Sequence, residues 1–228
     1  NNEIGTLNDV HRLSGILSNS TIFHTDAAQA LGKMDFNVHQ SGIHLLSLSA
    51  HKIYGPKGIG ALFVRRGTRL KPLWDGGGHE RGKRSGTLNV SGIVGFAKAI
   101  QLLMDSREEE ETRIRQLMGY CLNRMAQTID HVKLNGPAIP QRLLGNLNFQ
   151  IDGIDAETLA LKIPDLCIST GSACTSADPE PSHVLQAIGL NEMQARSSIR
   201  IGIGRFNTEE DVECAVLKIA QVVRTLRP

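Results

Sequence analysis

The chain carries the stretch Ser49-Ala50-His51-Lys52-Ile53-Tyr54-Gly55-Pro56-Lys57-Gly58 between two apolar runs, Ile43 to Ser49 and Gly60 to Val64. Apolar runs of this length bounded by glycine and proline predict β-strands, which places the stretch at the carboxyl end of a strand. A fixed lysine amine that follows Ser-x-His at a strand end is suited to condense with a carbonyl group. Most lysines in loops are simply solvated, so Lys52 alone is weak evidence and its context has to decide.

A second polar residue at a strand end lies upstream. Residues 7–17 show apolar side chains near helical spacing, and a β-rich run over residues 20–25 ends at Asp26. In open α/β sheets ligands bind outside the carboxyl ends of the strands, so Asp26 and residues 49–52 are expected to converge on one crevice. Residues 76–87 are glycine-rich and basic, which predicts an ordered loop suited to hold an anion.

The rest of the chain alternates helices and strands. A long helical pattern covers residues 90–128. Beyond it we expect strands over residues 132–134, 146–151, 166–170 and 198–203, and helices near residues 156–161 and 182–188. The closing segment Thr208-Glu209-Glu210-Asp211 resembles a capping box and predicts the start of a final amphipathic helix. The second half of the chain is therefore expected to be α+β.

Composition excludes several classes of protein and site. The 228 residues include 25 basic and 23 acidic ones, and the net charge of +2 is too balanced to indicate a nucleic-acid or membrane-surface partner. No apolar run approaches the roughly 20 residues needed to cross a bilayer, so no membrane span is expected. The four cysteines form no CxxC pair and no metal-ligand spacing. We therefore expect free thiols in a reducing compartment and no metal site.

The four cysteines differ in their sequence surroundings. Cys174 lies among small residues in Gly171-Ser172-Ala173-Cys174-Thr175-Ser176, which predicts a mobile, exposed loop and an accessible nucleophile. Cys121 and Cys214 lie in amphipathic helical patterns and Cys167 in an apolar run. Free cysteine in such positions usually behaves as a small buried hydrophobe, so these three are expected to be structural.

Several segments together resemble one family. The motifs at residues 24–29, 49–58 and 84–87 have the order and spacing of fold-type I pyridoxal-phosphate enzymes. The chain resembles class V aminotransferase-like proteins and, within them, the cysteine desulfurases of the housekeeping and nitrogen-fixation type. The resemblance runs nearly end to end and is also strong at residues 1–5, 169–176 and 197–200. It implies an α/β fold in which residues 1–107 are the carboxy-terminal part of a large, mostly parallel-sheet cofactor domain. Residues 108–228 are then a smaller α+β domain that carries the catalytic cysteine loop.

The resemblance implies pyridoxal 5'-phosphate as the cofactor and assigns residues to it. Lys52 is expected to bind the cofactor covalently and to move the proton at the substrate α-carbon. Asp26 is expected to face the pyridine nitrogen, where a carboxylate favours the protonated ring, and Gln29 is expected to donate to the ring hydroxyl. Ser49 and His51 are expected to hold phosphate oxygens.

The remaining assignments concern the substrate and the partners. The resemblance implies that Arg200 binds the substrate carboxylate, for which its planar donor fork is suited. Arg200 lies between two isoleucines in a strand-like run, so it is expected to project to the opposite face from them, toward a cleft. Asn1 is expected near the ring oxygen and the same carboxylate. Thr87 is expected to reach the phosphate of the neighbouring subunit in a homodimer. Cys174 is expected to take sulfur from L-cysteine as a persulfide, releasing L-alanine, and to deliver it to a scaffold protein for iron-sulfur cluster assembly and other thio-cofactors.

The sequence leaves alternatives open. The family's amino-terminal portion, with a further phosphate-binding segment and a histidine stacked on the cofactor, has no counterpart in these residues, so we expect the chain to be a fragment whose activity alone is uncertain. A selenocysteine lyase or another class V enzyme would use the same lysine, aspartate and arginine. A third reading is a non-catalytic fragment that dimerises or binds a scaffold. The expected location is the cytoplasm, with organellar targeting left open.

Overall fold

The computed structural model describes residues 1–18, 20–170 and 180–227. Close backbone contacts group the chain into two units: a first unit, Asp9–Arg107, and a second unit that combines Asn1–Asn8 with Glu108–Pro228. The division expected from the sequence fell at the same step after Arg107, with residues 1–8 in the first part. Those residues group with the second unit because the backbone oxygens of Asn2 and Glu3 accept hydrogen bonds from side chains of its sheet.

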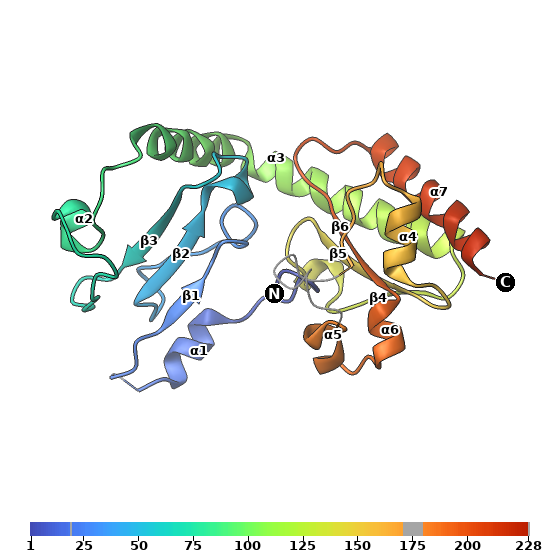
Figure 1. The fold of residues 1–228 in the computed structure, drawn as a ribbon, viewed down its shortest axis with the longest axis horizontal. Coiled ribbons are helices and arrows are strands. Elements are labelled where there is room, and N and C mark those ends of the chain that lie inside the picture. Colours follow the sequence, from blue (N-terminus) through green and yellow to red (C-terminus); the bar gives the residue numbers. More distant parts are fainter. Residues whose placement is uncertain (19, 171–179, 228) are drawn as a thin grey trace. The chain divides into compact units, whose positions relative to one another are not determined.

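The first unit is built on a three-stranded mixed sheet in the order β1-β2-β3 (Figure 1). β1 (His24–Asp26) pairs in parallel with β2 (Leu45–Ser49), and β2 pairs antiparallel with β3 (Gly60–Val64). The unit also contains α1 (Val10–Ile16), the 3-10 helix η1 (Ala50–Ile53), α2 (His79–Gly82) and the first half of α3 (Val90–Thr128). Because β1 and β2 run in the same direction, both carboxyl ends lie at one edge of the sheet.

The second unit contains an antiparallel sheet in the order β4-β5-β6 (Figure 1). Its strands are β4 (Val132–Leu134), β5 (Asn146–Ile151) and β6 (Ser198–Gly202). Its helices are the second half of α3, η2 (Ile139–Gln141), α4 (Ala156–Lys162), α5 (His183–Ala187), α6 (Glu192–Arg196) and α7 (Glu209–Leu226). Leu147 and Phe149 of β5 and Ile199 of β6 are fully buried and pack in one core cluster with apolar side chains of α3, α4 and α7.

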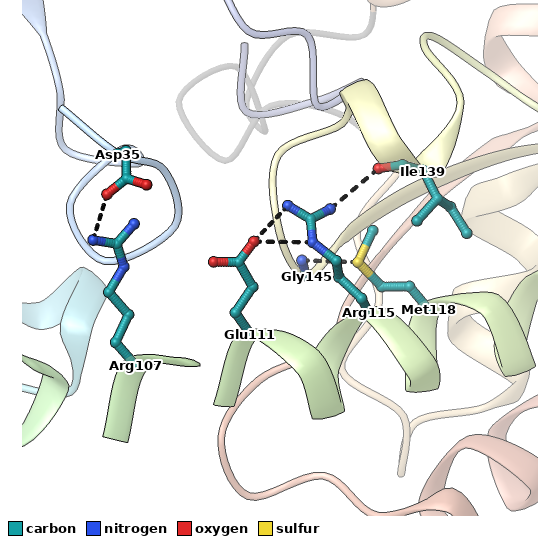
Figure 2. Close-up of polar contacts among 7 residues, drawn as sticks. All are labelled: Asp35, Arg107, Glu111, Arg115, Met118, Ile139 and Gly145. Carbon is teal, nitrogen blue, oxygen red and sulfur yellow. Dashed lines mark hydrogen bonds and ion pairs between the residues drawn. The ribbon is translucent and has the colours of Figure 1, made fainter. Parts of the chain in front are cut away.

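Arginines on α3 tie connecting loops of each unit to the helix, as Figure 2 shows. In the first unit Arg107 pairs with Asp35 at 2.7 Å. In the second unit Arg115 bonds Glu111 at 2.8 Å and donates to the Ile139 carbonyl oxygen at 3.4 Å. The bond to Ile139 connects α3 to the first residue of η2, which leads directly into the buried Arg142.

Most elements expected from the sequence are present. The capping box at the start of α7 is confirmed, because Thr208 Oγ1 accepts from Asp211 N at 3.2 Å and Asp211 Oδ2 accepts from Thr208 N at 3.0 Å. The strand expected over residues 166–170 is wrong. Only Ser169 in that stretch pairs with a strand, as an isolated antiparallel bridge to Arg200. The apolar residues before Ser169 serve as side-chain packing against the core rather than as a strand ladder. Helix α6 was not expected.

No helix among the residues described is both long enough and apolar enough to cross a lipid bilayer.

The core of the second unit generates a stability prediction on α4. Leu159 is fully buried in the core cluster, whereas Leu161, two residues later on the same helix, is 81% exposed. Leu159→Ala is expected to lower the free energy of unfolding by about 2–5 kcal/mol, because it leaves a cavity. Leu161→Ala is the matched control and is expected to change it by less than about 0.5 kcal/mol. Urea unfolding of both variants measures the difference, and equal effects would contradict the packing described.

Candidate functional site

The carboxyl edge of the parallel strand pair gathers polar side chains in the first unit. Asp26 ends β1 opposite Ser47 of β2, and Ser49 ends β2 two residues further on. The Asp26 side chain is exposed, and its Oδ1 accepts from Ala28 N at 2.9 Å, which orients the carboxylate at the strand end. The convergence of Asp26 with the segment after β2, expected from the sequence, therefore follows from the strand pairing.

The turn that carries Lys52 is fixed by its own buried side chains. Residues i and i+3 of a 3-10 helix lie on the same side. In η1 these are Ala50 and Ile53, which are 0% and 2% exposed and pack against apolar side chains of α3. His51 and Lys52 between them are exposed. The backbone of the turn is thus held rigidly while the lysine amine is presented to solvent.

The polar side chains of the turn contact each other. Ser49 Oγ and His51 Nδ1 lie 2.8 Å apart in a hydrogen bond whose donor depends on the histidine tautomer. The turn ends at Tyr54, whose left-handed backbone (φ 66°) closes it, and Gly55 N donates to Ala50 O at 2.9 Å. A serine hydroxyl, three residues before the lysine, and an imidazole, one residue before it, are therefore held side by side.

The other residues assigned in the first unit lie on connecting segments. Gln29 follows β1 and is partly buried. Its Oε1 accepts a hydrogen bond from Lys33 Nζ at 3.2 Å, so the Nε2 amide group is the part of the side chain suited to donate to a ligand. Thr87 is exposed and lies in the loop before α3, where its backbone oxygen accepts from Arg84 Nη1 at 3.4 Å. The glycine-rich loop expected to be ordered contains α2, a single turn in which Glu80 and Arg81 have left-handed φ values.

Arg200 and Asn1 belong to the second unit. Ile199 and Ile201 pack in the core, whereas Arg200 Nη1 donates to the backbone oxygen of Asn2 at 3.1 Å, so the arginine projects to the opposite face as expected. Asn1 is exposed, and its Oδ1 accepts from Glu3 N at 2.8 Å and Ile4 N at 3.2 Å. Asn1 Oδ1 is therefore used within its own turn, and its Nδ2 amide is the group suited to donate outward.

Sequence reasoning missed the buried amides beside Arg200. Asn146 and Asn148 of β5 are 8% and 3% exposed, and their Nδ2 atoms donate to the backbone oxygens of Asn2 at 2.9 Å and Glu3 at 3.2 Å. The alternation Asn146-Leu147-Asn148-Phe149-Gln150-Ile151 was visible, but a period of two usually marks a strand with one solvated face. A run of amides, rather than charges, was the signal that this face is buried.

The cysteines only partly follow expectation. Cys174 lies outside the described residues. Cys121 is 2% exposed, as expected for a structural thiol, and burial raises its pKa to about 12. The expectation is wrong for Cys167 and Cys214, which are both exposed. Cys167 lies outside any strand, and Cys214 lies on the outward face of α7, between the buried Val212 and Val216.

The residues at the edge of the first unit fit pyridoxal 5'-phosphate. An exposed amine, a serine and histidine pair and an exposed carboxylate match the aldehyde, the phosphate and the pyridinium nitrogen of that molecule in chemical character. Lys52 is the residue that would hold the aldehyde carbon, and Ser49 and His51 the phosphate.

Comparisons with known proteins find relatives along the whole chain. Residues 1–214 match the family described as aminotransferase class-V. The chain is 45% identical over 230 residues to the cysteine desulfurase IscS of Anaeromyxobacter dehalogenans (strain 2CP-C), covering 100% of this chain and 57% of that protein. The chain thus spans little more than half the length of this curated relative.

Solved structures agree with the family match. A protein described as NifS-like superposes with a TM-score of 0.89 at 31% identity, over 99% of this chain and 59% of the other. A structure described as SspA in complex with cysteine superposes with a TM-score of 0.71 at 34% identity, over 91% of this chain and 58% of the other. These matches confirm the fold-type I architecture expected from the sequence.

Thiol labelling provides a test of the cysteine environments. In a Cys174→Ser variant at pH 8, we expect a disulfide reagent such as dithionitrobenzoate to modify Cys167 and Cys214 rapidly, because both are exposed. Cys121 is expected to react only as the protein unfolds, since a thiol with a pKa of about 12 holds almost no thiolate at that pH. Additional Cys167→Ser and Cys214→Ser changes are expected to remove the rapid phase, and a rapid phase of three thiols would contradict these placements.

Proposed function

Because this chain belongs to the class-V aminotransferase family, we propose that it acts as a cysteine desulfurase, which removes sulfur from L-cysteine and holds it as a persulfide on Cys174. One observation carries the proposal. The exposed Asp26 ends β1 and the exposed Lys52 follows the adjacent parallel strand β2, at the same edge of one sheet. The identity to a named cysteine desulfurase over the full chain supports it.

The first unit supplies the residues for the cofactor. Pyridoxal 5'-phosphate, when bound, supplies a carbonyl that condenses with amines and a ring that accepts electrons from the substrate α-carbon. Lys52 Nζ would hold the carbonyl carbon until the amine of the substrate replaces it there, and the freed Nζ would then take the proton from the substrate α-carbon. Asp26 keeps the ring nitrogen protonated by Coulomb attraction, while Ser49 and His51 bind the phosphate and Gln29 donates to the ring hydroxyl.

The second unit supplies the residues for the substrate. Arg200 binds the carboxylate of L-cysteine with its planar donor fork, and Asn1 adds an amide donor. Cys174 attacks the sulfur as a thiolate, so that the bond from sulfur to the β-carbon breaks and a sulfur–sulfur bond forms. The sum converts L-cysteine and a thiol into L-alanine and a persulfide, which balances without an external oxidant or reductant.

The domain assignment and the partners are part of the same proposal. Residues 1–107 belong to the large cofactor domain and residues 108–228 form the small domain with the catalytic cysteine loop. Two subunits form a homodimer in which Thr87 reaches the phosphate of the neighbouring site. The persulfide passes to a scaffold protein for iron-sulfur cluster assembly, and the reaction takes place in the cytoplasm. The exposed position of Thr87 is compatible with an intersubunit role.

The principal test uses the absorption of the bound cofactor together with alanine formation from L-cysteine. Lys52→Ala is expected to abolish the visible band and to lower alanine formation by at least about a hundredfold. Cys174→Ser is expected to keep the band and to lose persulfide and alanine formation. Lys57→Ala and Cys214→Ser are matched controls, because both side chains are exposed and neither is assigned to the reaction.

Each outcome of this test separates the alternatives. Absence of the band in the unchanged protein, both alone and with the amino-terminal segment of a relative added, would overturn the desulfurase proposal and favour the non-catalytic fragment. Alanine formation that persists in Cys174→Ser would favour a lyase that acts without a cysteine nucleophile, such as a selenocysteine lyase.

The role of Asp26 makes a separate prediction. Asp26→Asn is expected to slow exchange of the α-hydrogen of L-alanine with deuterated solvent by at least about a hundredfold, because the ring nitrogen loses the charge that keeps it protonated. Proton NMR of L-alanine in D2O measures this exchange without requiring sulfur transfer. Asp35→Asn, which removes the carboxylate paired with Arg107 in the same unit, is expected to leave the rate unchanged. Equal rates in Asp26→Asn and the unchanged protein would refute the assignment.

A further inference from the structure

Strand β5 is buried on both faces. All six of its residues, Asn146 to Ile151, are buried. Leu147, Phe149 and Ile151 pack in the apolar core of the second unit, so the alternate residues Asn146, Asn148 and Gln150 point to the other face. That face also carries Arg200, which lies directly opposite Asn148 on β6. Arg200 therefore shares this face of the sheet with a row of buried amides.

One backbone oxygen connects Arg200 to this layer. The carbonyl oxygen of Asn2 accepts from Arg200 Nη1 at 3.1 Å and from Asn146 Nδ2 at 2.9 Å. The Asn146 Oδ1 atom in turn accepts from Arg142 Nη1 at 3.3 Å. A buried amide thus lies between a buried guanidinium and the carbonyl that holds Arg200.

Arg142 begins this chain of hydrogen bonds and is itself held by several acceptors. It is 1% exposed, and its guanidinium donates to the backbone oxygens of Pro137, at 2.8 Å, and Asn135 as well as to Asn146. Burial lowers the pKa of Arg142 to about 10, which leaves the side chain protonated at neutral pH. Asn146 is therefore held at its oxygen by a cation, which orients its Nδ2 toward Asn2 and strengthens that hydrogen bond.

The backbone around Asn2 is shaped for this close approach. Gly5 has a left-handed φ of 72°, and a Cβ atom there would lie 2.6 Å from Arg142 Cγ and 2.9 Å from Asn146 Oδ1. Only glycine lets the chain turn directly over the two side chains. On its outer side the same segment is anchored by Ile4, which packs with Leu185 and Ala195, and by Glu3, whose Oε2 accepts from Ser182 Oγ at 2.5 Å.

We propose that Asn146 is a positioning residue for the group that binds the substrate carboxylate. By holding the Asn2 carbonyl, Asn146 fixes one Nη1 hydrogen bond of Arg200 and thereby the plane of its guanidinium, which leaves the other N–H groups aimed at the carboxylate. The same bond holds the backbone next to Asn1. This inference rests on the proposed role of Arg200 and adds a residue that does not itself touch the substrate.

The test measures preference for a carboxylate rather than activity. L-alanine and ethylamine differ only in the carboxylate, and their dissociation constants are read from the change in cofactor absorption of the intact, cofactor-loaded protein. Asn146→Asp keeps the shape and the acceptor for Arg142 but turns an oxygen toward the Asn2 carbonyl. It is expected to lower the preference for L-alanine over ethylamine about tenfold, the size of one hydrogen bond to a charged group. The cofactor band and the ethylamine affinity are expected to stay unchanged.

Asn148→Asp is the matched control. Asn148 is likewise a buried amide on the same face of β5. Its Nδ2 donates to the Glu3 carbonyl, to which Asn146 Nδ2 makes a longer second contact at 3.4 Å, whereas Arg200 bonds the Asn2 carbonyl. A general loss of stability would affect both variants, whereas the positioning role predicts that Asn148→Asp changes the preference by less than about twofold. Asn146→Ala, which removes the amide without adding charge, is expected to lower the preference as well and replaces Asn146→Asp if that variant does not fold.

The outcomes distinguish this inference from the proposed function. If the unchanged protein shows no cofactor band or no preference for L-alanine, the proposed function or the assignment of Arg200 fails. If the unchanged protein prefers L-alanine and the Asn146 variants keep that preference, only the positioning role fails. Equal losses in the Asn146 and Asn148 variants would also overturn it. With L-cysteine, the expected signature is a raised KM with a nearly unchanged kcat for Asn146→Asp.

Discussion

The constraint on which the second unit depends is the burial of β5 on both faces. A buried amide without a partner is costly, so Asn146 and Asn148 require acceptors that the neighbouring strands do not provide. The backbone oxygens of Asn2 and Glu3 supply them. This requirement ties residues 1–4 to a sheet formed more than a hundred residues later in the chain. It also brings the residue that follows Asn1 into contact with Arg200, through the Asn2 carbonyl.

The first unit presents its reactive groups by a different arrangement. Its polar side chains are exposed, and rigidity comes from the backbone beneath them. The parallel pairing of β1 and β2 places Asp26 and Ser49 at one edge. Ala50 and Ile53 pack against α3, so the turn between them has little freedom while Lys52 remains accessible. A site built on a strand end and a pinned turn holds its geometry better than one on a free loop.

Local patterns predicted elements well where the local signal and the tertiary contacts agree. The long helix α3, the capping box at Thr208 and the strands on either side of the lysine turn are examples. The strand expected over residues 166–170 failed because a strand requires a continuous hydrogen-bonding partner, and only Ser169 has one, at Arg200. The expectation that Cys214 is buried was wrong for a related reason. An amphipathic pattern predicts that one side of a helix is buried, but the width of the buried side depends on which segments pack against the helix.

The sequence by itself determined the family, the strand-end position of Asp26, Ser49, His51 and Lys52, and the direction in which Arg200 leaves its strand. These features depend on motifs and on the period of two along a strand, which are local properties of the chain. Only the tertiary structure decided that the opposite face of β5 is buried and that Asn146 shares the Asn2 carbonyl with Arg200. The sequence pattern of an alternating strand is the same whether its polar face is exposed to water or covered by backbone, because segments distant in sequence decide whether that face is buried.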